Sequence, residues 1–110
     1  MDSPSLVIYC TCPDPATAER IAEALVSERL AACVNLVPGL TSIYRWQGQI
    51  QRDSEWLLII KTRNTIYPLL ETRIRDLHPY AVPEIIALPI QAGSAAYLDW
   101  IVDSTGASPV

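Results

Sequence analysis

The chain has 110 residues, of which half are hydrophobic and 18% are charged, and its formal net charge at pH 7 is −4. This length suits one domain with its own core. Scattered lysines and arginines in an acidic chain argue against a nucleic-acid partner, because phosphate binding needs clustered positive charge. No apolar run approaches the roughly 18 residues that cross a membrane, and the first residues lack the positive region of a signal peptide, so we expect a cytoplasmic protein.

The first third of the chain predicts a strand followed by a helix. Residues 5–11 are almost entirely apolar and predict the strand. Asp14 and Pro15 are typical of a helix start, as capping residue and first helical residue, and the helix is expected to end near Arg29. Its buried stripe comprises Ala18, Ile21, Ala22, Leu25 and Val26.

A long hairpin follows. Residues 32–47 and 50–63 predict two strands joined at Gln47 and Gly48. Pro38 and Gly39 interrupt the first of them and predict a bulge or bend. The hairpin is too long for a compact sheet, so its tip should project, and we expect its aromatic residues to form contacts between subunits: Tyr44, Trp46 and Trp56.

The last third predicts helix, strand and helix. Asn64 or Thr65 should cap a helix that carries Pro68 in its first turn, with a buried stripe of Ile66, Leu70, Ile74 and Leu77. Residues 84–90 predict a strand, and the apolar run of residues 85–90 indicates that it is buried on both faces. Ser94 should cap a short helix ending near Val102, and residues 103–110 show no pattern and are expected to be disordered.

The element order is strand, helix, strand, strand, helix, strand and a terminal helix. It predicts a single α+β domain over residues 1–110, a split β-α-β sandwich with two helices on one face of an antiparallel sheet. Three strands do not alternate, so the other sheet face is also apolar. Leaving that face in water would cost several kcal/mol at about 25 cal/mol per Å², and we therefore expect identical subunits to cover each other's sheets.

Five stretches carry a resemblance to a known family. They are residues 10–14 (CTCPD), 30–35 (LAACVN), 41–48 (TSIYRWQG), 58–62 (LIIKT) and 78–86 (HPYAVPEII). In this order they resemble the CutA divalent-cation tolerance proteins. The resemblance implies a ferredoxin-like fold assembled as a homotrimer, similar to the PII signalling proteins, and a role in tolerance of copper and other divalent metals.

The resemblance also implies a metal site at Cys10 and His78, with copper as the natural ion. Leu77 stands where some members have a second histidine, and Ala81 replaces a larger polar residue. From the residues themselves, Cys12 lies two positions from Cys10 on the same strand face, so it can either join a site or pack in the core. The three cysteines are expected as free thiols, with Cys33 in the core, and His78 could instead bond to the backbone.

Two other functions stay open at this point. One is a small-molecule sensor with a ligand pocket between subunits near Lys61, Tyr80 and Glu84, although Lys61 and Glu84 could also form a structural ion pair. The other is an assembly scaffold. Motifs for nucleotide binding, metalloprotease and serine-hydrolase chemistry are absent, so we expect neither catalysis nor an organic cofactor.

Overall fold

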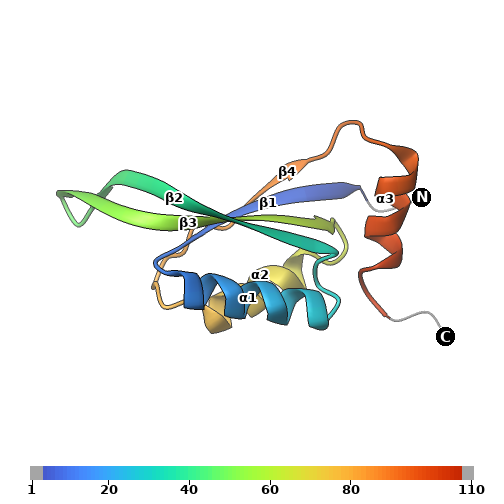
Figure 1. Ribbon diagram of the computed structural model, residues 1–110, viewed down its shortest axis with the longest axis horizontal. Helices are drawn as coiled ribbons and strands as arrows, with labels where there is room; N and C mark the ends of the chain where they lie inside the picture. Colours follow the sequence, from blue (N-terminus) through green and yellow to red (C-terminus); the bar gives the residue numbers. More distant parts are fainter. Residues whose placement is uncertain (1–3, 108–110) are drawn as a thin grey trace.

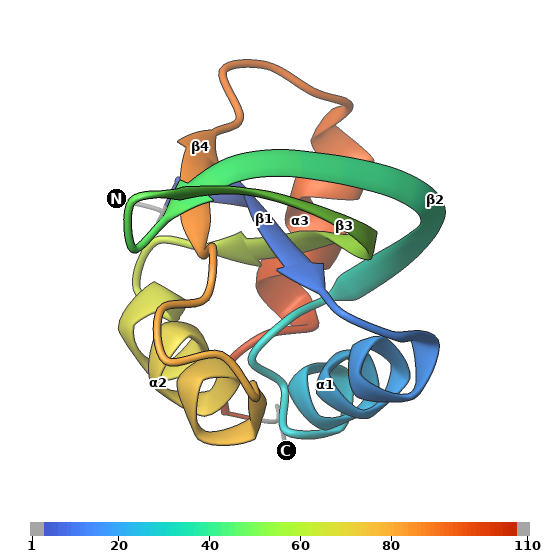
Figure 2. The ribbon, with the colours of Figure 1, turned by 90° about the vertical axis from the view of Figure 1, so that its left-hand side faces the viewer.

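The chain folds into a four-stranded antiparallel sheet with two helices packed on one face (Figures 1 and 2). The computed structural model describes residues 4–107. The strand order is β2-β3-β1-β4, which confirms the predicted α+β, ferredoxin-like arrangement. In chain order the elements are β1 (Ser5–Cys12), α1 (Pro15–Ser27), β2 (Cys33–Trp46), β3 (Gln49–Arg63), α2 (Tyr67–Leu77), β4 (Ile86–Pro89) and α3 (Ala95–Asp103).

The two covering helices begin in different ways. In α1 the Asp14 carboxylate accepts a hydrogen bond from the Thr17 N–H at 2.7 Å, and Pro15 opens the first turn, as predicted. The capping prediction for α2 is wrong: Ile66 occupies the cap position and makes no side-chain cap bond. The chain first makes a turn in which the Ile66 N–H donates to the Arg63 carbonyl, so the helix begins at Tyr67.

The core lies between the sheet and these helices. Successive side chains of a strand point to opposite faces, so alternate residues of β1 and β3 face the helices. The larger apolar side chains that are fully buried in this layer are Ile8, Cys10, Cys12, Leu58 and Ile60 from the sheet and Ile21, Leu25, Leu70 and Ile74 from the helices.

The β2–β3 hairpin projects from this body (Figure 1). Its pairing shifts between Val37 and Leu40, which confirms the bulge expected at Pro38 and Gly39. Gln47 and Gly48 have φ values of 50° and 78°, the left-handed conformation that a two-residue hairpin turn requires. The projection makes the chain 48 Å long but only 26 and 22 Å across.

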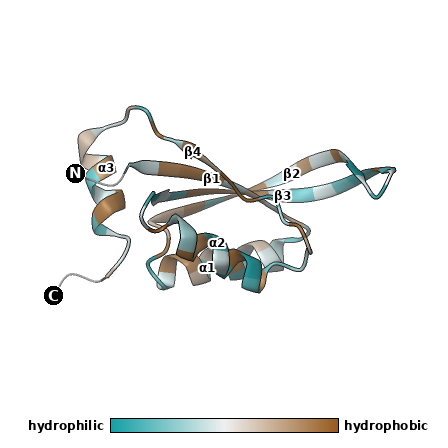
Figure 3. Cartoon of the chain, turned by 180° about the vertical axis from the view of Figure 1, so that it is seen from behind, coloured by the Kyte–Doolittle hydropathy of each residue, from teal (hydrophilic) through white to brown (hydrophobic). Residues whose placement is uncertain are grey.

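The sheet face opposite α1 and α2 is open. All four residues of β4 are exposed, so the expected burial of this strand on both faces is not reached within one chain. β4 lies at the sheet edge, and its Ile86 and Leu88 pair with β1 residues that face away from the helices. Figure 3 shows hydrophobic colour along β1 and β4 and more hydrophilic colour towards the hairpin tip.

The expectation of a disordered tail is wrong for residues 103–107. Thr105 is 2% exposed, and the Arg63 guanidinium donates to its hydroxyl at 2.8 Å. Arg29 donates to the Gly106 carbonyl at 2.7 Å, while the Gly106 N–H donates back to the Arg29 carbonyl. The end of α3 is thereby tied to the body, and residues 108–110 lie outside the described part of the chain. No helix within residues 4–107 is long and apolar enough to cross a membrane.

Candidate functional site

A buried cluster of two thiols and one imidazole lies under β1. Cys10 and Cys12 are two residues apart on the strand, so both point to its helix-facing side. His78 is the residue directly after α2 and approaches them from the helix layer. The two sulfur atoms and a ring nitrogen all lie within 4.8 Å of one another. These are three potential ligands of two types, thiolate and imidazole, that suit a soft or borderline ion.

Both ring nitrogens of His78 are already engaged with the backbone. Nε2 lies 2.8 Å from the Thr11 carbonyl oxygen, which can only accept a hydrogen bond, so Nε2 carries the proton. Nδ1 accepts from the Tyr80 N–H at 3.1 Å. If Nδ1 also carried a proton, two N–H donors would point at each other. The geometry therefore fits the neutral imidazole with its proton on Nε2. His78 can bind a metal only by releasing one of these two bonds.

The two cysteines have opposite protonation tendencies. Hydrogen bonding by the Cys10 thiol lowers the pKa of Cys12 to about 6, against the effect of burial and with the help of His78. The same contact with Cys12, together with burial, raises the pKa of Cys10 far above its usual value. Burial works against protonation of His78, but the nearby Cys12 sulfur and the Thr11 carbonyl outweigh burial and raise its pKa. Of the two thiols, that of Cys12 is therefore the more readily deprotonated.

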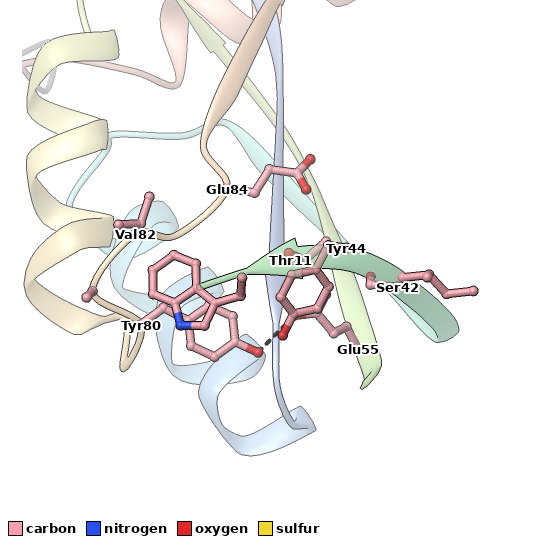
Figure 4. Close-up of a pocket in the computed structure, with 10 residues that line it drawn as sticks. Thr11, Ser42, Tyr44, Glu55, Tyr80, Val82 and Glu84 are labelled. Carbon is pink, nitrogen blue, oxygen red and sulfur yellow. Dashed lines mark hydrogen bonds between the residues drawn. The ribbon is translucent and has the colours of Figure 1, made fainter. Parts of the chain in front are cut away.

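A pocket lies on the other side of the same segment of β1. Its cavity of about 620 Å³ is lined by Thr11, which stands between the two cysteines, and by residues of the hairpin and of the loop after α2. The Tyr80 hydroxyl donates to Glu55 Oε2 at 2.8 Å across it (Figure 4). The other lining residues are Ser42, Ile43, Tyr44, Trp46, Ala81, Val82 and Glu84.

The sequence-predicted pocket residues are only partly brought together. Tyr80 and Glu84 line the pocket, but Lys61 does not, and its ammonium group donates to the Asn35 side chain instead. Lys61 is on the same face of β3 as Glu55 but six residues further along, about 20 Å at 3.3 Å per residue. Within one chain, Lys61 therefore lies too far along the strand to join Tyr80 and Glu84.

The three aromatic residues predicted for the subunit interface also separate. Tyr44 and Trp46 are 40% and 44% exposed and line the pocket. Trp56 is partly buried and packs against the core of its own chain, because it lies on the helix-facing side of β3. Only Tyr44 and Trp46 thus remain available for contacts between subunits.

Sequence reasoning missed Glu55. Its side chain is only 6% exposed, although it is a carboxylate at the head of the apolar segment 56–60. Its position directly before an apolar strand segment could have identified it, since an acidic residue buried there needs a polar partner. The partner, Tyr80, is 25 residues away and could not be read from local spacing.

Comparisons with known proteins agree on one family. The family model described as CutA1 divalent ion tolerance protein matches residues 6–104. A divalent-cation tolerance protein CutA from Thermus thermophilus is 57% identical over 100 residues, which cover 91% of this chain and 97% of that protein. The solved structure of the divalent cation tolerance protein from the same organism covers 93% of this chain and 99% of its own, with a TM-score of 0.91 and 56% identity.

Other relatives are longer. The rice protein named "Protein CutA 1, chloroplastic" is 49% identical over 102 residues, which are 93% of this chain but 58% of the rice protein. The chain thus spans nearly all of the Thermus relative and little more than half of the rice one.

Proposed function

The chain belongs to the CutA1 divalent ion tolerance family, and from that premise we propose that it is a non-catalytic, cytoplasmic metal-response protein that binds copper as a homotrimer. The observation that carries the copper site is the convergence of Cys10, Cys12 and His78 within 4.8 Å. Cys10 and His78 were expected as ligands. Cys12 is added because its thiolate is the more readily formed of the two.

The donor set favours Cu(I). Thiolate is a soft ligand that selects Cu(I), and copper heads the affinity order of divalent ions for nitrogen and sulfur donors. The two sulfur atoms are the primary ligands because they give up no strong hydrogen bond to the rest of the chain; apart from its interaction with Cys12, the Cys10 thiol makes a long contact of 3.9 Å with the Thr11 carbonyl. The imidazole can act as a third ligand only if one of its nitrogens releases its hydrogen bond with Thr11 or Tyr80.

The open sheet face supports the homotrimer. Val37, Ile86 and Leu88 are 39%, 48% and 42% exposed in the single chain. Exposed apolar groups of this size on one face are typical of a surface that another subunit covers. The number three comes from the family resemblance, and light scattering at micromolar concentration tests it: a folded species of about 12 kDa would contradict the proposal.

Calorimetry with Cu(I) under reducing conditions tests the metal site. We expect Cys10→Ser and Cys12→Ser each to weaken binding by at least about 100-fold, a usual scale for loss of a ligand or its support. His78→Ala should weaken it less. Cys33→Ser is the matched control, because Cys33 is the one cysteine outside the cluster, and it should bind like the parent.

Acidification provides a second measure. Metal displaces protons from its ligands, so Cu(I) affinity should fall as the pH drops below about 6, where Cys12 takes up its proton. Equal binding by the parent, both serine variants and the Cys33→Ser control would mean that any copper uptake lies elsewhere.

A further inference from the structure

The loop that follows α2, residues 79–84, is fastened through Tyr80. The Tyr80 N–H donates to His78 Nδ1 at 3.1 Å, and the Tyr80 hydroxyl donates to Glu55 Oε2 at 2.8 Å. Among the residues that the structure describes, these two bonds are the ones that hold the loop in place. Its two prolines have no N–H with which to add others.

The imidazole of His78 stands between this loop and the two thiols. The His78 N–H donates to the Ile74 carbonyl at 2.8 Å, which ends α2 and fixes the backbone at this residue. The ring donates through Nε2 to the Thr11 carbonyl and lies against the ring of Tyr80, with 4.7 Å between the ring centroids. Because the backbone of His78 is fixed, any change at the imidazole is felt by the loop that begins directly after it.

His78 loses its bond to the Tyr80 N–H whichever of its nitrogens binds a metal ion. Nδ1 accepts that N–H through the same lone pair with which it would bind the ion. Nε2 would first have to give up its proton, and a neutral ring then carries the proton on Nδ1, where it points at the Tyr80 N–H. The second route also breaks the bond to Thr11. The bond to Tyr80 is therefore the contact that ligation by His78 breaks in both cases.

We propose that His78 couples the thiol cluster to the Tyr80 loop, so that copper ligation by His78 and the present position of residues 79–84 exclude each other. This coupling rests on the copper site proposed above. With His78 bonded to the backbone, the loop is held at both the N–H and the hydroxyl of Tyr80. With His78 as a ligand, the Tyr80 N–H has to find water, and the loop is held by the bond to Glu55 alone.

The coupling links the two sides of β1. The thiols face the helices, whereas Tyr80 and Glu55 line the cavity on the other side of the strand (Figure 4). Glu55 belongs to the hairpin, whose exposed aromatic residues are the ones left for contacts between subunits. In the proposed homotrimer, copper ligation by His78 would therefore be felt at that contact.

The coupling also works in the opposite direction. Two binding events that exclude each other weaken each other by the same factor. The Tyr80–Glu55 bond favours the present position of the loop, so it should lower the copper affinity that His78 contributes. A variant without this bond should then bind copper more tightly. That gain is not expected if His78 only supports the backbone and copper is held by the two thiols alone.

NMR of the ¹⁵N-labelled full chain during titration with Cu(I), under reducing conditions, tests the coupling directly. Cu(I) has a filled d shell, so signals close to it stay visible. We expect a ring nitrogen of His78 to shift as it becomes a ligand. Hydrogen exchange of the Tyr80 amide should become at least about tenfold faster in the loaded chain, because its acceptor is lost. The backbone amide of His78, bonded to Ile74, is the internal control and should exchange at an unchanged rate.

Two variants and a matched control separate the coupling from a structural role. Tyr80→Phe leaves every cluster ligand in place but removes the bond to Glu55, and it should raise Cu(I) affinity by about fivefold or more, the lower end of usual coupling effects. His78→Asn keeps an acceptor for the Tyr80 N–H but has no imidazole, so it should cancel this gain and leave the Tyr80 amide unchanged by copper. Tyr67→Phe removes the other tyrosine–glutamate bond, on α2, and should bind copper like the parent.

The outcomes separate the coupling from the copper site itself. Cu(I) uptake that depends on Cys10 and Cys12 but changes neither the His78 ring nitrogens nor the Tyr80 amide would overturn the coupling and leave the copper site standing. Equal Cu(I) affinity of the parent and Tyr80→Phe, or a gain that persists with His78→Asn, would also overturn it. Absence of Cu(I) uptake by the parent would remove the copper site and the coupling together. The NMR titration of the parent decides the question by itself if a variant does not fold.

Discussion

Two tyrosine–glutamate hydrogen bonds of equal length occur in very different surroundings. On α2 the Tyr67 hydroxyl donates to Glu71 at 2.8 Å, one helical turn away, and Arg75 lies 3.9 Å from the same carboxylate. In the pocket the Tyr80 hydroxyl donates to Glu55, also at 2.8 Å, but the two residues are 25 positions apart. No basic side chain within residues 4–107 forms an ion pair with Glu55.

The difference shows that hydrogen-bond geometry alone does not mark a site. In the Tyr67–Glu71 pair the carboxylate charge is compensated by a neighbouring arginine and by its exposure to solvent. The Tyr80–Glu55 pair has an equally good hydrogen bond but leaves most of a buried charge without compensation. A buried carboxylate with no basic partner within residues 4–107 is the feature that distinguishes the second pair.

The largest loss of folding stability is expected when the His78 side chain, which holds Tyr80 of the Tyr80–Glu55 pair, is removed. His78 holds Tyr80 through its Nδ1 and Thr11 through its Nε2. His78→Ala leaves a buried carbonyl and a backbone N–H without partners, at about 1–3 kcal/mol each, so we expect a loss of about 3 kcal/mol in the free energy of unfolding. Urea denaturation measures it. A loss below about 1 kcal/mol would show that water replaces both bonds.

Removing the hydroxyl from each pair gives a direct contrast. Tyr80→Phe removes the one hydrogen-bond donor that the buried Glu55 carboxylate has within residues 4–107, and it should cost about 2 kcal/mol. Tyr67→Phe should cost less than about 1 kcal/mol, since Glu71 keeps Arg75 and access to water. Thermal and urea unfolding of both variants provide the comparison, and equal losses would mean that the two carboxylates are equally well compensated.

Most of the fold was predictable from local patterns. Uninterrupted apolar runs predicted β1 and the second half of β3, Asp14 with Pro15 predicted the start of α1, and Pro38 with Gly39 predicted the bulge. The errors arose where tertiary contacts override local preference. The turn at Arg63 delays α2, and residues 103–107 are held by Arg29 and Arg63, which no local pattern in the tail indicates.

The sites were less predictable than the fold for the same reason. The spacing of Cys10 and Cys12 indicated a shared strand face, but only folding brings His78 to them from 66 residues away. For the pocket, Tyr80 and Glu84 were found from their motif, whereas Lys61, which was assigned to a pocket between subunits, lies away from these two residues within one chain. Glu55 enters the pocket through the hairpin pairing and a loop contact, and both are long-range.

The smallest expected effect concerns titration at alkaline pH. Burial, followed by the hydrogen bond to Glu71, raises the pKa of Tyr67 to about 12, and burial with the bond to Glu55 raises that of Tyr80 further above its usual value. In the unfolded chain both phenols ionise near pH 10, so the stability that they contribute is complete below pH 10 and is lost as the pH rises through their folded pKa values.

Absorbance at 295 nm after a stopped-flow pH jump should show one phenolate forming near pH 12, absent in Tyr67→Phe, and a later one absent in Tyr80→Phe. Glu55→Gln should move the later transition only part of the way towards pH 10, because burial is the larger cause and remains. A Tyr80 transition that precedes that of Tyr67 in the parent would mean that burial and the neighbouring carboxylate together act less strongly on Tyr80 than on Tyr67, and would remove the contrast between the two pairs.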